Sequence, residues 1–320
     1  NLPAKSLLLS KKRNLWQKVK FVFTSLNFSL NLAQKQTKFK LLLHYNANLH
    51  FLHKGKFMAE VAGFELEGIY YVVLFAVAIF AGFIDSIVGG GGLIALPALM
   101  ACGVPAHLSL ATNKLQGVFG TFTATLTYFK SLTMKHLAWG VFFTALGAAL
   151  GVWAVLLIND KHLKLIILVF LIATFLYMAF KPNLGKQKSE SKITNIKIFH
   201  IFIGFSLGFY DGFLGPGTGS FLIFACVMLL GYNLKEASIN TKIFNFTSNV
   251  VALAMFLCLY EVLWAVGILM GVGQIIGAFL GSKLVLKTQG NFIKVLFLVV
   301  VGATICKVGY DYAKSLGLLS

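Results

Sequence analysis

The sequence predicts an all-α polytopic membrane protein with two inverted repeats of about five transmembrane segments each, eight to ten segments in total, interrupted by glycine-rich broken helices. The first supporting observation is composition: of the 320 residues, 58% are hydrophobic and 12% are charged, whereas about a quarter of the residues in a soluble domain are charged. The second is a series of apolar runs, most of them close to the roughly 20 residues that span a bilayer. The third is that both halves of the chain carry the same series of features.

The first 57 residues differ from the rest in charge. They contain 11 of the 28 Lys and Arg residues and no acid, so a basic arm lying on an anionic membrane surface is one interpretation. Residues 53–57 directly precede Met58, however, and their Lys-Gly codons can supply a ribosome-binding purine tract. We therefore expect residues 1–57 to be a leader or a non-native N-terminal extension.

Ten apolar segments follow, in two sets of five. The long polar connection at 181–197 is expected to be a cytoplasmic linker between a first membrane repeat, 58–180, and a second one, 198–320. The segments are 69–88, 93–103, 108–129, 137–158, 163–180, 198–214, 217–231, 239–260, 262–285 and 292–311. The second and seventh are short and lie beside glycines, so we expect helices that stop inside the membrane.

The two sets resemble each other in their charged residues and glycines. An offset of 126 residues pairs Asp85 with Asp211, and an offset of 128 residues pairs Lys114 with Lys242. In each half the Asp is followed by a glycine-rich break, a short apolar segment and a polar helix start. Such a duplication is typical of a secondary transporter, and an odd number of segments per half makes the two copies inverted.

The lysines predict which loops face the cytoplasm. With residue 58 outside, nine lysines lie in the loops of one side and three in those of the other, as the positive-inside rule requires. The lysine-rich loops are 130–136, 181–197, 232–238 and 286–291. We therefore expect a multi-pass protein of the cell inner (plasma) membrane with these loops in the cytoplasm.

Four charged residues lie deep in apolar segments, as one Asp and one Lys in each half: Asp85, Lys114, Asp211 and Lys242. A charge at the bilayer centre costs about 2.5 to 3.5 kcal/mol on insertion scales, so such residues have a structural or a functional reason. Two ion pairs that tie helices together are one explanation. The other is a cavity in which an anion competes with the carboxylates for the lysines.

The glycine-rich breaks at 84–97 and 211–220 favour a binding site, although close helix packing alone would also use glycine. A broken helix exposes backbone N–H groups at the start of the next helix, where the dipole is positive and an anion can bind. Amide, hydroxyl and ammonium donors follow each break and suit an oxyanion such as a sulfonate, sulfite or carboxylate. The candidate substrate-binding residues are Asp85, Gly89, Gly90, Gly91, Gly92, Thr112, Asn113, Lys114, Asp211, Gly215, Gly217, Thr218, Gly219, Ser220, Asn240, Thr241, Lys242, Asn245 and Asn249.

Other motifs give no support for an enzyme, a metal site or a cofactor. Residues 204–208 match the GxSxG of serine hydrolases, but Gly204, Gly208 and Gly212 keep the four-residue spacing of a helix-packing face. An intramembrane hydrolase would also need a base near Ser206, and none is apparent. Neither glycine run ends in the GKS or GKT of a P-loop, and the sequence has no HExxH motif. Its four cysteines form no CxxC pair.

With these motifs the chain resembles the TauE/SafE family, also called the TSUP permeases, over about residues 68–312. The matching motifs are the glycine run at 85–92 with Pro97, the helix start at 111–114, residues 211–219, and residues 240–242 with Asn245 and Asn249. The resemblance implies a membrane transporter of small anionic, often sulfur-containing compounds such as sulfite. The expected partners are the lipid bilayer, a small anion, a coupling ion (proton or sodium) and further copies of the chain in a homo-oligomer, but not nucleic acid.

A membrane scaffold or assembly partner without transport activity is the alternative from another class. It would use glycine faces for helix packing and buried ion pairs for stability. Transport is favoured because a scaffold has no reason to duplicate a charged constellation at membrane depth.

Overall fold

The computed structural model describes residues 68–180, 190–193 and 195–287. The predicted leader, most of the polar connection at 181–197 and the apolar segment at 292–311 lie outside the described residues. The domain boundaries therefore stay predictions.

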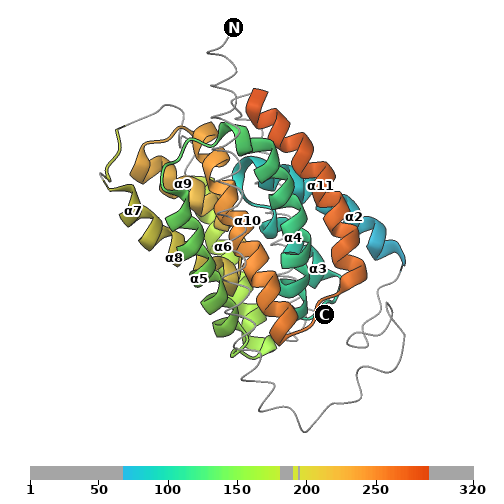
Figure 1. Cartoon of the computed structure of the whole chain (residues 1–320). Coiled ribbons are helices and arrows are strands. Elements are labelled where there is room, and N and C mark those ends of the chain that lie inside the picture. Colours follow the sequence, from blue (N-terminus) through green and yellow to red (C-terminus); the bar gives the residue numbers. More distant parts are fainter. Residues whose placement is uncertain (1–67, 181–189, 194, 288–320) are drawn as a thin grey trace.

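The described residues form helices and no β-strand (Figure 1). The first half contains α2 (Gly68–Val88), α3 (Gly92–Ala101), α4 (Ala106–Tyr128), the 3-10 turn η1 (Phe129–Ser131), α5 (Leu137–Val155) and α6 (Asp160–Phe180). The second contains α7 (Ile196–Phe199), the π-helical turn η2 (His200–Gly204), α8 (Phe205–Phe213), α9 (Thr218–Leu230), α10 (Leu234–Leu259) and α11 (Trp264–Lys287).

Within these ranges, five helices are long and apolar enough to cross a membrane, namely α2, α5, the continuous run Ile196–Phe213, α10 and α11. Helices α3 and α9 are apolar but shorter, as the sequence predicts. The all-α polytopic membrane class is thereby confirmed.

Glycines end the helices at the two predicted breaks. Helix α2 ends before Gly89, which has φ +77°, and α8 ends before Gly215, which has φ +89°. Such left-handed conformations are open to glycine at little cost. The two breaks also meet each other: the Ser220 N–H donates to Gly89 O at 3.0 Å, and a Cβ on Gly89 would overlap the backbone of Gly219. The breaks therefore converge inside the bundle.

Helices from opposite halves pack on each other through small residues. Helix α2 lies along α11, and α8 lies along α5, with α4 and α10 between these two pairs (Figure 1). A Cβ on Gly208 or Gly212 would overlap the backbone of Thr144 or Ala148. Ser206 is exposed on the opposite side of the same helix. The packing interpretation of the GxSxG match is confirmed.

The predicted lysine-rich loops gather at one end of the bundle. Hydrogen bonds join the loop after α4 to α10, the segment before α7 to the end of α9, and the start of α10 to the end of α11. These contacts are the Met134 N–H with Asn240 Oδ1 at 2.8 Å, the Lys192 N–H with Leu229 O at 2.9 Å, and Lys235 Nζ with Leu286 O at 2.7 Å. Which compartment this end faces stays a prediction.

The two central helices begin at opposite ends. Helix α10 begins at the lysine-rich end, whereas α4 begins at the other end. There His107, the second residue of α4, contacts Asp160 at the start of α6 and the ring of Tyr260 at the end of α10. Lys114 and Lys242 each lie eight residues past the first residue of their helix, which is about 12 Å along the axis. This placement is the one expected of inverted repeats, and the repeat relation itself stays a prediction.

Candidate functional site

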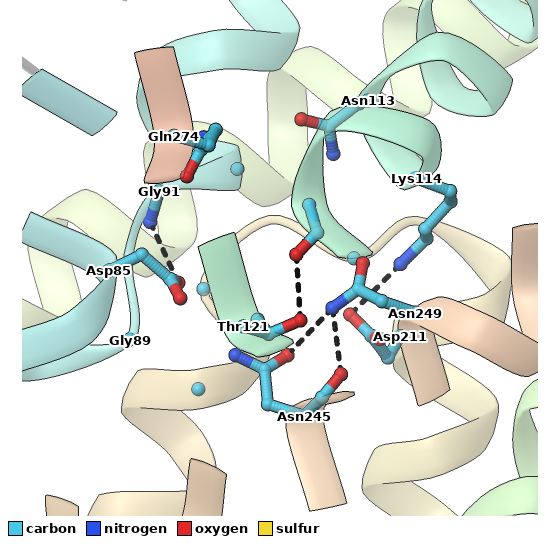
Figure 2. Close-up of a pocket in the computed structure, with 15 residues that line it drawn as sticks. Asp85, Gly89, Gly91, Asn113, Lys114, Thr121, Asp211, Asn245, Asn249 and Gln274 are labelled. Carbon is cyan, nitrogen blue, oxygen red and sulfur yellow. Dashed lines mark hydrogen bonds and ion pairs between the residues drawn. The ribbon is translucent and has the colours of Figure 1, made fainter. Parts of the chain in front are cut away.

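A small polar cavity lies where the glycine breaks meet the central helices (Figure 2). Its volume is about 30 Å³, which is room for about two water molecules. The lining residues are Asp85, Gly89, Gly91, Gly92, Asn113, Lys114, Gly117, Thr121, Asp211, Gly215, Gly217, Gly219, Asn245, Asn249 and Gln274. Both halves of the chain thus contribute to one site.

Twelve of the 19 candidate residues line this cavity: Asp85, Gly89, Gly91, Gly92, Asn113, Lys114, Asp211, Gly215, Gly217, Gly219, Asn245 and Asn249. They are separated by up to 164 positions in the sequence, yet the fold brings them together. That they bind a substrate stays a prediction.

The other seven candidates are outside the lining, and most have structural partners. Gly90 is buried within the first break. The hydroxyls of Thr218, Ser220 and Thr241 donate to the backbone oxygens of Gly215, Val88 and Ala237, and that of Thr112 accepts from the Leu263 N–H. Asn240 accepts from the N–H groups of Thr133 and Met134 and so holds the loop after α4. Lys242 lies behind the lining, against Asp85.

The ion pairs connect the two halves of the chain. Lys114 Nζ lies 3.0 Å from Asp211 Oδ1, and Lys242 Nζ lies 3.1 Å from Asp85 Oδ2. Each lysine therefore meets the aspartate of the other half, and each pair ties a long central helix to the end of a broken one.

The two pairs differ in how completely the carboxylate is bonded. Asp85 accepts from Lys242 at one oxygen and from the Gly91 N–H at the other, at 3.2 Å, and Lys242 also donates to the Asp85 backbone oxygen. Asp211 Oδ1 meets Lys114, but Asp211 Oδ2 has no hydrogen-bond partner among the described residues, although the side chain is 3% exposed. A buried polar atom without a partner is costly, so Asp211 Oδ2 is an unsatisfied acceptor of the site.

Lys114 is the ammonium group that faces the cavity. Its side chain is 1% exposed, and it lies close to the break after α8. A Cβ on Gly215 would lie 2.7 Å from Lys114 Nζ. Glycine at this position therefore leaves space for the ammonium group beside the carboxylate of Asp211. A dashed line in Figure 2 marks the ion pair between Lys114 and Asp211.

Hydrogen bonds between side-chain amides orient one donor toward the cavity from α4. Gln274 Nε2 donates to Gln116 Oε1 at 3.3 Å, and Gln116 Nε2 donates to Asn113 Oδ1 at 2.9 Å. Because the side-chain oxygen of Asn113 is the acceptor in this series of hydrogen bonds, the NH₂ group of Asn113 is left to donate.

A second donor is oriented in the same way on α10. Asn249 Nδ2 donates to the Asn245 backbone oxygen at 2.7 Å and to Asn245 Oδ1 at 3.1 Å (Figure 2). The NH₂ group of Asn245 is left to donate. The cavity therefore carries one ammonium and two amide groups as donors.

The backbone contributes fewer free donors than the sequence suggests. The N–H groups of Gly89, Gly91, Gly215, Thr218 and Ser220 already donate to acceptors within the protein. The expectation of open N–H groups is wrong at these five positions, because the breaks are closed by turns of their own and by the contact between them. Side chains carry most of the donor capacity of the site.

Three lining residues are absent from the sequence-based candidates: Gly117, Thr121 and Gln274. Gln274 is the sole amide in the apolar segment 262–285, which is a signal that could have identified it. Its position opposite Gly82 of α2 and Gly120 of α4, where a Cβ would overlap it, is visible only in the fold. The Thr121 hydroxyl donates to the backbone oxygen of Gly117 at 2.6 Å. A threonine that serves helix packing alone makes the same bond.

Comparisons with known proteins agree on one family. The family model described as sulfite exporter TauE/SafE matches residues 74–308. A Sinorhizobium sp protein named "Probable membrane transporter protein ORF9" is 42% identical over 229 residues, covering 71% of this chain and 87% of that protein. A Haemophilus influenzae protein with the name "Probable membrane transporter protein" is 38% identical over 241 residues, covering 75% and 94%. Escherichia coli YfcA, also named a probable membrane transporter protein, is 39% identical over 241 residues, covering 75% and 89%. No solved structure matches the chain.

Proposed function

Because the chain belongs to the sulfite exporter TauE/SafE family, whose model matches residues 74–308, we propose that it is a permease that carries a small sulfur oxyanion, such as sulfite or an organosulfur anion, across the cell inner membrane. The family and the names of its relatives support membrane transport. The substrate class is argued from the chemistry of the cavity.

The observation that carries the substrate class is the buried ammonium group of Lys114 beside the cavity. An ammonium group bonds an anionic oxygen more strongly than a neutral one. The amide groups of Asn113 and Asn245 add two further donors from neighbouring helices. A sulfite or sulfonate group has three oxygens and can accept from all three donors at once.

The small size of the cavity fits one state of a transport cycle. A cavity with room for about two water molecules is too small for most organosulfur anions, so the site must widen for entry and release. Alternating access in secondary transporters moves helices around a fixed central site. The breaks after α2 and α8 are the positions where such movement is expected, because the backbone leaves the helical conformation there, at Gly89 and Gly215.

A scaffold remains the second candidate function. The pair Lys242–Asp85 would serve it well, as would the glycines through which α8 packs on α5 and those through which α11 packs on α2. A scaffold function gives no purpose to Lys114 and Asp211 in the cavity, since a packed core gains nothing from a partly satisfied carboxylate such as that of Asp211.

A transport assay tests the proposal. Inverted and right-side-out membrane vesicles with and without the protein are compared for uptake of sulfite, thiosulfate, taurine, sulfoacetate and acetate. We expect uptake of at least one sulfur compound, reduced in Lys114→Gln and unchanged in Lys161→Gln, a matched control at an exposed lysine. Equal uptake with and without the protein, for every sulfur compound and in both orientations, would refute the proposal.

A further inference from the structure

We propose that Asp211 binds the coupling proton of the site, and that one proton enters at Asp211 Oδ2 with each monovalent anion that binds at Lys114. This inference rests on the proposed function and names the coupling ion of the same site.

The charges around the cavity already balance without a substrate. Two carboxylates, Asp85 and Asp211, face two ammonium groups, Lys114 and Lys242, in the two ion pairs. An added monovalent anion would leave one negative charge without compensation at membrane depth, where an unpaired charge is costly. A cation must therefore enter with the anion.

Asp211 is the carboxylate that can take up this charge. Both oxygens of Asp85 accept hydrogen bonds, from Lys242 and from the Gly91 N–H. Asp211 lines the cavity, and its buried Oδ2 has no partner among the described residues. A proton on this atom neutralises the carboxylate and frees Lys114 from its counter-charge. The ammonium group can then pair with the anion.

A proton suits this position better than a metal cation does. A hard cation requires several oxygen ligands around it, but Lys114 occupies Asp211 Oδ1, and the amide groups of Asn113 and Asn245 present donors. Within the described residues, no three His, Cys, Asp or Glu side chains lie close enough to hold a metal ion.

The helices packed against Asp211 offer few competing sites for the proton. Helix α5 has no ionisable side chain, and α9 has one, Cys226. Tyr210, next to Asp211 on α8, donates its hydroxyl to Pro216 O at 2.7 Å. Lys242 of α10 is held by Asp85, and the remaining charged residues of that helix, Lys235 and Glu236, lie in its first turn.

The steps balance in charge and in atoms. Water on the side to which the site is open donates a proton to Asp211 Oδ2, and the site becomes singly positive. The anion binds at Lys114, and the site returns to neutrality. On the other side the anion leaves, Asp211 releases its proton to water, and the pair Lys114–Asp211 forms again.

The test uses purified protein in liposomes with methanesulfonate and thiosulfate as probes, because neither anion changes its charge near neutral pH. In the wild type we expect a proton gradient, acidic on the outside, to raise methanesulfonate uptake severalfold, and a sodium gradient to have no effect. Asp211→Asn mimics the protonated acid. It should exchange internal for external anion but gain nothing from the proton gradient. Glu261→Gln, the same change at an exposed site, should behave like the wild type.

The outcomes separate the two proposals. Uptake by the wild type that ignores the proton gradient, or gradient-driven uptake retained by Asp211→Asn, would overturn the proton site. If the wild type takes up neither of these anions nor any sulfur compound of the transport assay above, the proposed function fails and this inference falls with it. Should Asp211→Asn not fold, a second measurement decides: adding methanesulfonate to weakly buffered wild-type protein should raise the pH of the medium, and a constant pH on binding would refute the inference.

Discussion

Lys242 Nζ lies 3.1 Å from Asp85 Oδ2, although the two residues belong to opposite halves of the chain. With its hydrogen bond to the Asp85 backbone oxygen, the ammonium group of Lys242 fixes the end of α2 against α10. In the other ion pair, Lys114 Nζ lies 3.0 Å from Asp211 Oδ1. Both of these residues line the cavity, and Asp211 Oδ2 has no hydrogen-bond partner among the described residues. We therefore expect the two pairs to serve different purposes, the pair Lys242–Asp85 in structure and the pair Lys114–Asp211 in binding.

The first prediction concerns the pair Lys242–Asp85. Removing one partner leaves a buried charge uncompensated, which costs about 3 to 5 kcal/mol. We expect Lys242→Gln to lower the melting temperature of the protein in detergent, and the double change with Asp85→Asn to restore most of it together with transport. A double variant as unstable as the single one would contradict the assignment of this pair to structure.

The second prediction concerns the contact between the breaks. Gly89→Ala places a Cβ into the backbone of Gly219 and imposes a left-handed conformation on alanine, which by itself costs about 1 to 2 kcal/mol. We expect little folded protein in the membrane, measured by fluorescence-detected size exclusion. Gly68→Ala is the matched control, because a Cβ at Gly68 meets nothing within 4 Å. Normal levels of both variants would show that the breaks do not touch.

The third prediction concerns the amide chain that orients Asn113. Gln274→Met keeps the length of the side chain but removes the donor to Gln116, a bond of about 1 kcal/mol. We expect a loss of anion affinity of about fivefold with unchanged protein levels. The control is Ile275→Met on the same helix, whose side chain is 39% exposed. Equal affinities in the two variants would exclude an orienting role for Gln274.

The fourth prediction concerns topology. A reporter inserted after Lys188 should report the cytoplasm. One inserted in the loop after α5, following Ile158, should report the outside. The reason is that the lysine-rich loops lie at one end of the bundle, and lysine-rich loops face the cytoplasm. Two reporters on the same side would contradict the predicted arrangement of the loops.

Local features of the fold were predictable because they depend on spacing along one helix. The small residues Gly204, Gly208 and Gly212 recur every four positions, so they form one face whatever that face contacts. The breaks at Gly89 and Gly215 were predictable for a similar reason, since runs of glycine do not continue a helix comfortably.

The partners of these features were not predictable from one sequence. Two aspartates and two lysines allow two ways of pairing, and only the packing of α4 and α10 against the broken helices selects the exchange between halves. Asn240 was a candidate for binding because it follows a break, yet it holds the loop after α4. A polar residue at a helix start serves either purpose, and the neighbours that decide lie more than 100 residues away.

Equilibrium binding of sulfite to the purified protein, measured for Lys114→Gln and Lys242→Gln side by side, tests the central claim most directly. Both changes remove one buried ammonium group of nearly equal exposure, but only Lys114 lines the cavity. A charge-assisted hydrogen bond contributes about 1.5 to 3 kcal/mol, so Lys114→Gln should weaken binding about tenfold or more. The fraction of Lys242→Gln that folds should bind with nearly the wild-type affinity. Wild-type affinity in Lys114→Gln, with a large loss in folded Lys242→Gln, would contradict the account.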